Sequence, residues 1–116
     1  MSRDYRLYLD DMRMAAEKVL RYTQDADLAH FVEDEKTFDA VVRNLEIIGE
    51  AAKHVSAEVQ ERYPGVEWRS IAGLRDIVAH EYFGIDEDIL WDIVMNQVPE
   101  LLGQVRAILK QEGYEE

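Results

Sequence analysis

Apolar residues recur at three- and four-residue steps along most of the 116-residue chain, and only two prolines and six glycines interrupt them. This period matches the turn of an α-helix and leaves little room for the two-residue alternation of strands. The chain is about one domain long, and 47% of its residues are hydrophobic, so it can bury a core of its own. The pattern predicts one all-α domain over residues 1–116.

The helical pattern divides into four long segments with short connections. We expect helices over residues 4–23, from a cap at Thr37, over residues 68–84 and over residues 87–111, the last bent at Pro99. Short extra helices are expected in the polar connection after the first helix and behind a cap at Ser56. Together these segments predict a mostly antiparallel bundle of the four-helix type. The candidate core residues are Leu7, Met14, Val19, Leu20, Val41, Leu45, Ile48, Ala52 and Val55.

The chain is strongly acidic, with 25 acidic and 13 basic residues and a formal charge of −12. Such a charge repels polyanions, so any nucleic-acid site must be local. The absence of cysteine excludes disulfides, thiolate metal ligands and cysteine nucleophiles. No apolar run approaches the ~18–20 residues that span a bilayer, and the first ten residues do not have the layout of a secretion signal. We therefore expect a soluble cytoplasmic protein with no membrane partner.

The stretch "LRDIVAHEYFG", residues 74–84, has a polar side suited to chemistry. On a helical wheel Arg75, Asp76, Ala79, His80 and Tyr82 fall within a sector of roughly 160°, and the apolar residues fall opposite. Because Asp76 and His80 are four residues apart, the carboxylate can orient the imidazole as a base. The fork of the Arg75 guanidinium matches phosphate oxygens. A solvated helix face or an ordinary dimer contact would show the same spacing, so the pattern alone leaves these alternatives open.

Other residues that could carry chemistry have simpler explanations. Glu50 and His54 are four residues apart, but the Glu-x-x-His pairs of a di-iron bundle are absent, so we expect a surface pair and no metal site. Gly49 is costly inside a helix unless a neighbour needs the room, which predicts tight helix packing there, with the dimer seam as one place for it. Trp68 and Trp91 lie in apolar surroundings and are expected in the core.

Three segments of the chain carry a resemblance to a known family. They are "NLEIIGEAAKHVS" at 44–56, "YPGVEWRSIAGLRDIVAHEYFGID" at 63–86 and "LWDIVMNQVPELL" at 90–102. Together they resemble the HEPN-domain ribonucleases of the HepT type, toxins that are paired with a minimal nucleotidyltransferase antitoxin. The resemblance covers nearly the whole chain and implies the HEPN fold for the helical bundle.

The central signature of that family is an arginine, a polar residue, three variable positions, a histidine, any residue and a tyrosine. Arg75, Asp76, His80 and Tyr82 meet it. The polar position is often Asn, so Asp76 is a departure that adds negative charge beside the expected phosphate. The resemblance implies a homodimer whose two motif helices form one cleft for RNA.

The resemblance also implies a reaction and its control. Arg75 and His80 would cleave RNA without a metal or other cofactor, Asp76 would support His80, and the nucleotidyltransferase would silence the toxin by transferring AMP to Tyr82. A rival interpretation is a catalytically idle HEPN dimer that serves as binding partner or substrate-presenting subunit of a nucleotidyltransferase. The low isoelectric point favours this rival, because an acidic dimer draws RNA against its own field. The intact set of motif residues favours the nuclease.

Overall fold

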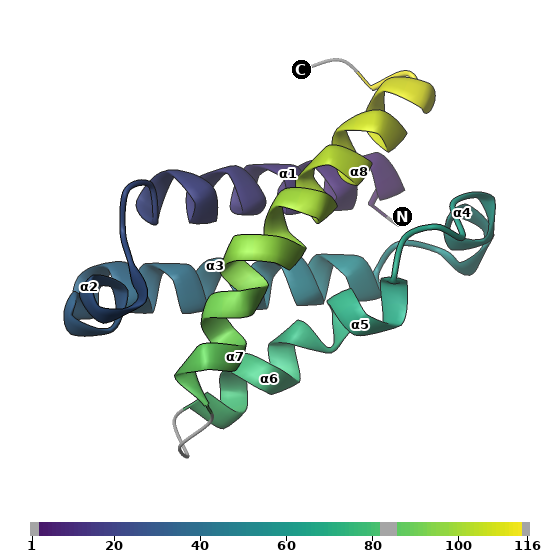
Figure 1. Cartoon of the computed structure of the whole chain (residues 1–116). Helices are drawn as coiled ribbons and strands as arrows, with labels where there is room; N and C mark the ends of the chain where they lie inside the picture. Colours follow the sequence, from purple (N-terminus) through teal and green to yellow (C-terminus); the bar gives the residue numbers. More distant parts are fainter. Residues whose placement is uncertain (1–2, 82–85, 115–116) are drawn as a thin grey trace.

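The computed structural model describes residues 3–81 and 86–114, and for His80 and Glu81 it describes the backbone only. The described residues form helices and no strand, which confirms the predicted all-α class (Figure 1). The three longest helices are α1 (Tyr5–Tyr22), α3 (Glu35–Lys53) and α8 (Val98–Gln111). The shorter elements are α2 (Leu28–Glu33), α4 (Ala57–Arg62), α5 (Trp68–Ala72), α6 (Leu74–Glu81), α7 (Glu87–Asp92) and the π-helix η1 (Ile93–Gln97).

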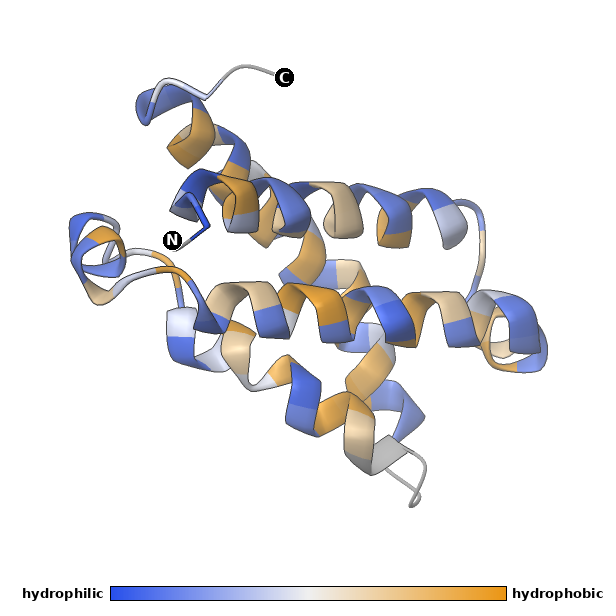
Figure 2. Ribbon diagram, turned by 180° about the vertical axis from the view of Figure 1, so that it is seen from behind, coloured by the Kyte–Doolittle hydropathy of each residue, from blue (hydrophilic) through white to orange (hydrophobic). Residues whose placement is uncertain are grey.

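The helices α1 and α3 lie side by side and form the centre of the molecule. The helix α8 packs across α1, and α5 and α6 pack along α3, on the side away from α1 (Figure 1). Hydrophilic and hydrophobic residues alternate along α1 and α3, as expected of helices with one buried and one exposed face (Figure 2). Among the described residues, no helix has both the length and the apolar character that crossing a bilayer requires.

Short polar side chains begin several of these helices. The Ser56 hydroxyl accepts a hydrogen bond from the Val59 N–H, which confirms the predicted cap of α4. The predicted cap at Thr37 is wrong, because Asp34 caps α3. The Asp34 carboxylate accepts hydrogen bonds from both the N–H and the hydroxyl of Thr37, and the helix therefore begins at Glu35.

Two of the predicted long helices are interrupted. The segment expected over residues 68–84 divides at Gly73 into α5 and α6, and the described part ends at Glu81. Glycine is a poor helix former, which explains the break at that point. Gly84, the predicted end, lies outside the described residues. The last segment changes to π-helix just before Pro99, which stands in the first turn of α8 without an N–H to donate.

The core lies between α1, α3, α8 and the pieces packed on them. The predicted stripe is confirmed, since its members from Val41 to Ala52 on α3, and Val55 just after this helix, are buried. In α1, Val19 is buried and Leu20 packs against the core, but the predictions for Leu7 and Met14 are wrong, because these side chains are 36% and 42% exposed. Their positions lie nearly opposite the stripe that is buried. That stripe consists of Leu9, Met12, Ala16 and Val19.

One carboxylate ties the end of the chain to its beginning. Glu112, which follows α8, accepts hydrogen bonds from the hydroxyls of Tyr5 and Tyr63 and from the Arg62 guanidinium. Tyr5 starts α1, and Arg62 and Tyr63 end α4, so three segments that are distant in the sequence meet at this side chain. The hydrogen bonds from Tyr5, Tyr63 and Arg62 hold the pKa of Glu112 below its usual range.

Candidate functional site

The helix α6 carries the motif residues on one side and core residues on the other. Leu74 and Val78 are 2% and 0% exposed, whereas Arg75, Asp76 and Ala79 are exposed. The two-sided character predicted for this stretch is therefore confirmed. Burial of the apolar side fixes the rotation of the helix, and that rotation determines which residues face solvent.

The motif residue His80 lies near the end of the described part of this helix. The backbone of His80 belongs to α6, one turn after Asp76 and five residues after Arg75. The described part of the helix reaches Glu81. Tyr82 lies outside the described residues. The assignment of Arg75, Asp76, His80 and Tyr82 as site residues stays a prediction.

The α6 helix lies very close to α3 at Gly49. A Cβ atom on Gly49 would stand 2.9 Å from the backbone nitrogen of Arg75 and 3.2 Å from the carbonyl oxygen of Ala72. Both distances are shorter than ordinary van der Waals contact. The predicted tight packing at Gly49 is thus found within the chain, where α3 supports the first turn of the motif helix.

The close approach brings the Arg75 side chain onto α3. Its Nη1 donates a hydrogen bond of 2.8 Å to Oε2 of Glu50, and the two side chains are 53% and 47% exposed. The other oxygen of Glu50 lies 3.4 Å from Nε2 of His54, one turn further along α3. Partial desolvation raises the pKa of Glu50, but the charge of Arg75 and the hydrogen bond with His54 lower it, and the net shift is downward.

The sequence indicated only part of this arrangement. It predicted Glu50 and His54 as a surface pair four residues apart, and both side chains are about half exposed. It did not predict that Arg75 joins them across the helix interface. The signal available was Gly49, because the residue after a close-packing glycine is brought near the partner helix.

A hollow of about 390 Å³ opens beside Arg75 between α1, α3 and α6. Two further arginines line it, Arg3 just before α1 and Arg43 on α3. The ring of Tyr8 lies stacked on the ring of His54, with centroids 5.0 Å apart and planes inclined by 19°. The Arg3 guanidinium lies over the same Tyr8 ring, 4.6 Å from its centroid.

Each arginine in the hollow has a carboxylate beside it. Arg3 pairs with Asp11 at 2.6 Å, and Arg43 lies 3.7 Å from Glu46. With the Arg75 pair, these groups make the hollow close to neutral in a chain whose formal charge is −12. Over residues 3–81 and 86–114, no three histidine, aspartate or glutamate side chains gather where they could hold a metal ion.

The fold and the motif helix together define a class of protein. An all-α chain that presents Arg75 and Asp76 to solvent on a helix that also contains His80 is compatible with the HEPN class of helical ribonucleases. The family model described as "Ribonuclease HepT-like" matches residues 12–108. The chain belongs to the HepT-like ribonuclease family, as its sequence predicted.

Curated relatives match the chain over nearly its full length. A protein of Methanocaldococcus jannaschii named "Putative RNase MJ0127" is 40% identical over 98% of this chain and 95% of its own. A protein of Thermococcus cleftensis named "Probable ribonuclease HepT" is 37% identical over 95% of this chain and all of its own. Another, "Putative RNase TTE0752" of Caldanaerobacter subterraneus subsp. tengcongensis, is 39% identical over 92% of this chain and 96% of its own. A search of solved structures gave no significant match.

Proposed function

We propose that this protein is an RNA endonuclease toxin, a single HEPN domain that acts as a homodimer and is paired with a nucleotidyltransferase antitoxin. The observation that carries the proposal is the exposed Arg75 on the motif helix of a HepT-like ribonuclease family member. Its guanidinium is half exposed and lies at the edge of a hollow, where a phosphate can reach it. The named RNases among the relatives support RNA as the substrate.

The reaction we propose uses the substrate's own 2′-hydroxyl as the nucleophile. His80 takes the proton of that hydroxyl, its oxygen attacks the adjacent phosphorus, and the bond to the 5′-oxygen breaks, leaving a 2′,3′-cyclic phosphate. The departing 5′-oxygen takes a proton from His80 of the second copy. General acid–base catalysis of this kind contributes roughly 10²–10⁴-fold. Arg75 stabilises the charge on the non-bridging oxygens, and Asp76 orients His80 from one turn away.

Dimerisation is part of this proposal. The motif contributes one histidine per chain, so a base and an acid together require two copies. Apolar side chains on the segment that follows the motif helix support a contact there, because Ile89 and Met95 are 48% and 51% exposed. Two copies also double the number of Arg75 guanidinium groups against an acidic background.

Control of the toxin is proposed to act through Tyr82. The partner nucleotidyltransferase would transfer AMP to its hydroxyl, two residues after His80 in the chain. The attached nucleotide adds bulk and negative charge at the cleft, and both would exclude the scissile phosphate.

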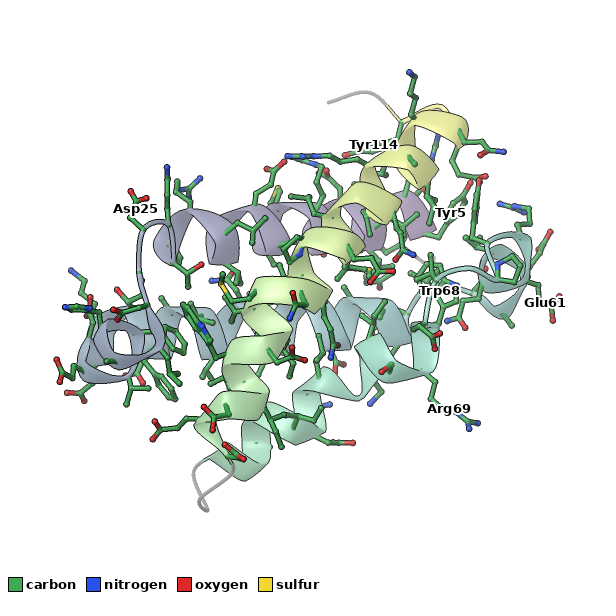
Figure 3. All side chains as sticks on the ribbon, viewed as in Figure 1. Tyr5, Asp25, Glu61, Trp68, Arg69 and Tyr114 are labelled. Atoms are coloured by element: carbon green, nitrogen blue, oxygen red, sulfur yellow. The ribbon has the colours of Figure 1, made fainter. Side chains whose placement is uncertain are left out.

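The function is tested with purified protein and a labelled single-stranded RNA. Cleavage should continue in excess chelator, give a 2′,3′-cyclic end and fail on the matching DNA. Arg75→Ala and His80→Ala should stay folded and lose at least about 10²-fold in rate, in line with general acid–base and charge stabilisation. Arg69→Ala, an exposed arginine that points away from the body of the protein, is the matched control (Figure 3). If the parent protein cleaves no RNA, or if both site variants cleave as it does, the proposal is wrong and the idle-partner interpretation gains.

A further inference from the structure

The hollow beside Arg75 contains a group of side chains that the cleavage reaction does not use. His54 closes α3 and is half exposed, and its imidazole is stacked on the Tyr8 ring. The Arg43 side chain on α3 is 71% exposed and reaches into the same hollow. A chain of contacts from His54 through Glu50 connects this stack to Arg75. The stacked rings and Arg75 thus lie in one hollow.

The chemistry of the hollow suits a nucleotide. Its volume of about 390 Å³ lies within the roughly 300–1,000 Å³ typical of small-ligand pockets. Proteins bind single-stranded nucleic acid by stacking bases on aromatic rings and by placing arginines along the backbone. The paired rings of Tyr8 and His54 offer the first, and Arg43 with Arg75 offers the second. The hollow is also close to neutral, which an RNA strand requires in so acidic a chain.

We propose that this hollow is a subsite for one nucleotide of the RNA strand, next to the bond that is cleaved. The base stacks on the His54 imidazole, which Tyr8 supports from behind, and Arg43 contacts a phosphate of the adjoining backbone. This inference rests on the proposed ribonuclease function and adds the residues that hold the strand beside the reacting bond.

The ion pairs of the hollow indicate which arginine is available to the strand. Arg43 lies 3.7 Å from Glu46 and is mostly exposed, so its guanidinium can turn to a phosphate at little cost. Arg3 is held at 2.6 Å by Asp11 and lies over Tyr8, which gives it a supporting place in the stack. Arg75 is held at 2.8 Å by Glu50 at the edge nearest the motif helix.

The first experiment measures RNA binding on the His80→Ala protein, which cannot act as the base. The probe is a fluorescein-labelled single-stranded RNA of mixed sequence. His54→Ala should weaken binding about tenfold, the factor equivalent to about 1.4 kcal/mol of stacking. His54→Phe keeps a flat ring and should bind as the His80→Ala parent does. His30→Ala, an exposed histidine paired with Asp27 outside the hollow, is the control and should change nothing.

The phosphate contact has its own readout. Log affinity falls as log salt rises, and Arg43→Ala should make this slope less steep by about 0.7, the value for one phosphate contact on a single strand. Arg69→Ala changes the net charge equally but lies outside the hollow, and it should leave the slope unchanged. Equal slopes for both variants would overturn the role of Arg43.

Nuclear magnetic resonance locates the strand directly. The chain has three histidines, so the His80→Ala protein keeps two imidazole signals, from His54 and His30. Addition of the RNA should shift the His54 signal and leave the His30 signal in place. If the His54 signal instead follows protein concentration and ignores RNA, the hollow lies between two copies of the chain and the subsite is wrong.

The outcome also separates this inference from the proposed function. In the protein with His80 intact, His54→Ala should raise KM about tenfold and leave kcat within about twofold, because stacking holds the strand in both the ground and transition states. Cleavage by the parent with no change in KM for His54→Ala would overturn the subsite and leave the function standing. RNA binding at His54 in a parent protein that cleaves no RNA would overturn the proposed function and leave the nucleotide-binding hollow standing.

Discussion

The backbone nitrogen of Arg75 lies 2.9 Å from the point at which a Cβ atom on Gly49 would stand. Gly49→Ala must therefore push α6 away from α3, since the two nearest neighbours, the Arg75 nitrogen and the Ala72 carbonyl oxygen, are backbone atoms that cannot turn aside. Forcing an extra carbon into a packed interface costs about 1–3 kcal/mol. We expect the free energy of unfolding, measured in urea, to fall by that amount. The rate of RNA cleavage should fall by up to about 10²-fold, because Arg75 moves relative to the substrate.

Gly103→Ala is the matched control for this substitution. Gly103 also lies within a helix, but a Cβ atom there would meet nothing within 4 Å. Replacing glycine by alanine in a helix interior then stabilises by about 0.5–1 kcal/mol. The free energy of unfolding should therefore fall in Gly49→Ala and rise in Gly103→Ala. Equal changes in the two variants would mean that the close approach of α6 and α3 is not what Gly49 provides.

The Arg75–Glu50 pair predicts an effect of charge on RNA binding. Glu50→Gln keeps an oxygen that can accept the hydrogen bond from Arg75 but removes the negative charge that competes with phosphate. Half-exposed ion pairs contribute about 0.2–1 kcal/mol, so the gain in affinity should be modest. We expect KM for RNA to fall about two- to fivefold at low salt, with a smaller effect at high salt. Initial rates over a range of RNA concentrations measure it.

A second carboxylate separates this local effect from net charge. Glu61→Gln makes the chain less acidic by the same amount, but Glu61 is exposed on α4, at the far right of the molecule in Figure 3. The helix α6, which carries Arg75, lies below the centre of the molecule in Figure 1. Its KM should stay within about 1.5-fold of the parent's at moderate salt, because separations beyond roughly 10 Å are screened. A fall in KM equal to that of Glu50→Gln would assign the effect to the overall field of the protein.

The sequence predicted the helical class well and the helix boundaries less well. Periodicity places the buried stripe of α3 because its residues all face one way, and any helix carrying them must bury them. It failed for Leu7 and Met14, since α1 offers apolar residues on two sides and only contact with α3 and α8 decides which side is buried. The cap at Asp34 was missed because Thr37, three residues later, is also a good capping residue.

The candidate site was predictable where it depends on one helix. The exposure of Arg75 and Asp76 follows from the burial of the opposite side of α6, which the sequence pattern contains. The contacts of Arg75 with Glu50, and the neighbouring stack of Tyr8 on His54, join residues from three helices. Their meeting depends on packing distances, and no local spacing in the sequence records these.

Glu112 predicts how stability depends on pH. The folded state lowers the pKa of its carboxyl, chiefly through the hydrogen bond from Tyr5, so the ionised form stabilises the fold. That stabilisation is fully present above the ordinary glutamate pKa of about 4.3 and is lost as the pH falls through the lower folded value. Glu112→Gln should lower the free energy of unfolding by about 2 kcal/mol at neutral pH, from hydrogen bonds to a charged group. Urea unfolding of both proteins at neutral and acidic pH should show the difference shrinking in acid.

The same cluster predicts a loss of stability at alkaline pH. The hydrogen bond to Glu112 is the largest cause that raises the pKa of Tyr63, and the folded state therefore favours its protonated hydroxyl. The stabilisation is present below the ordinary tyrosine pKa of about 10 and is lost as the pH rises through the folded value. In Tyr63→Phe, the free energy of unfolding should fall less steeply between neutral pH and about pH 11, as measured by urea unfolding. An equally steep fall in that variant would contradict this role of the Tyr63 hydroxyl.

The proposed control through Tyr82 predicts an increase in the mass of the chain. A chain produced together with its nucleotidyltransferase and ATP should carry one or more AMP units, and peptide mass spectrometry should place them on Tyr82. The modified protein should cleave RNA at least about 10²-fold more slowly, because the added phosphate repels the scissile phosphate and the nucleotide fills the cleft. Tyr82→Phe should gain no mass and should stay active in the presence of the transferase. Tyr22→Phe, an exposed tyrosine on α1, is the control and should be modified and silenced as the parent is. An AMP unit on another tyrosine, or a modified protein that cleaves RNA at the parent's rate, would contradict this form of regulation.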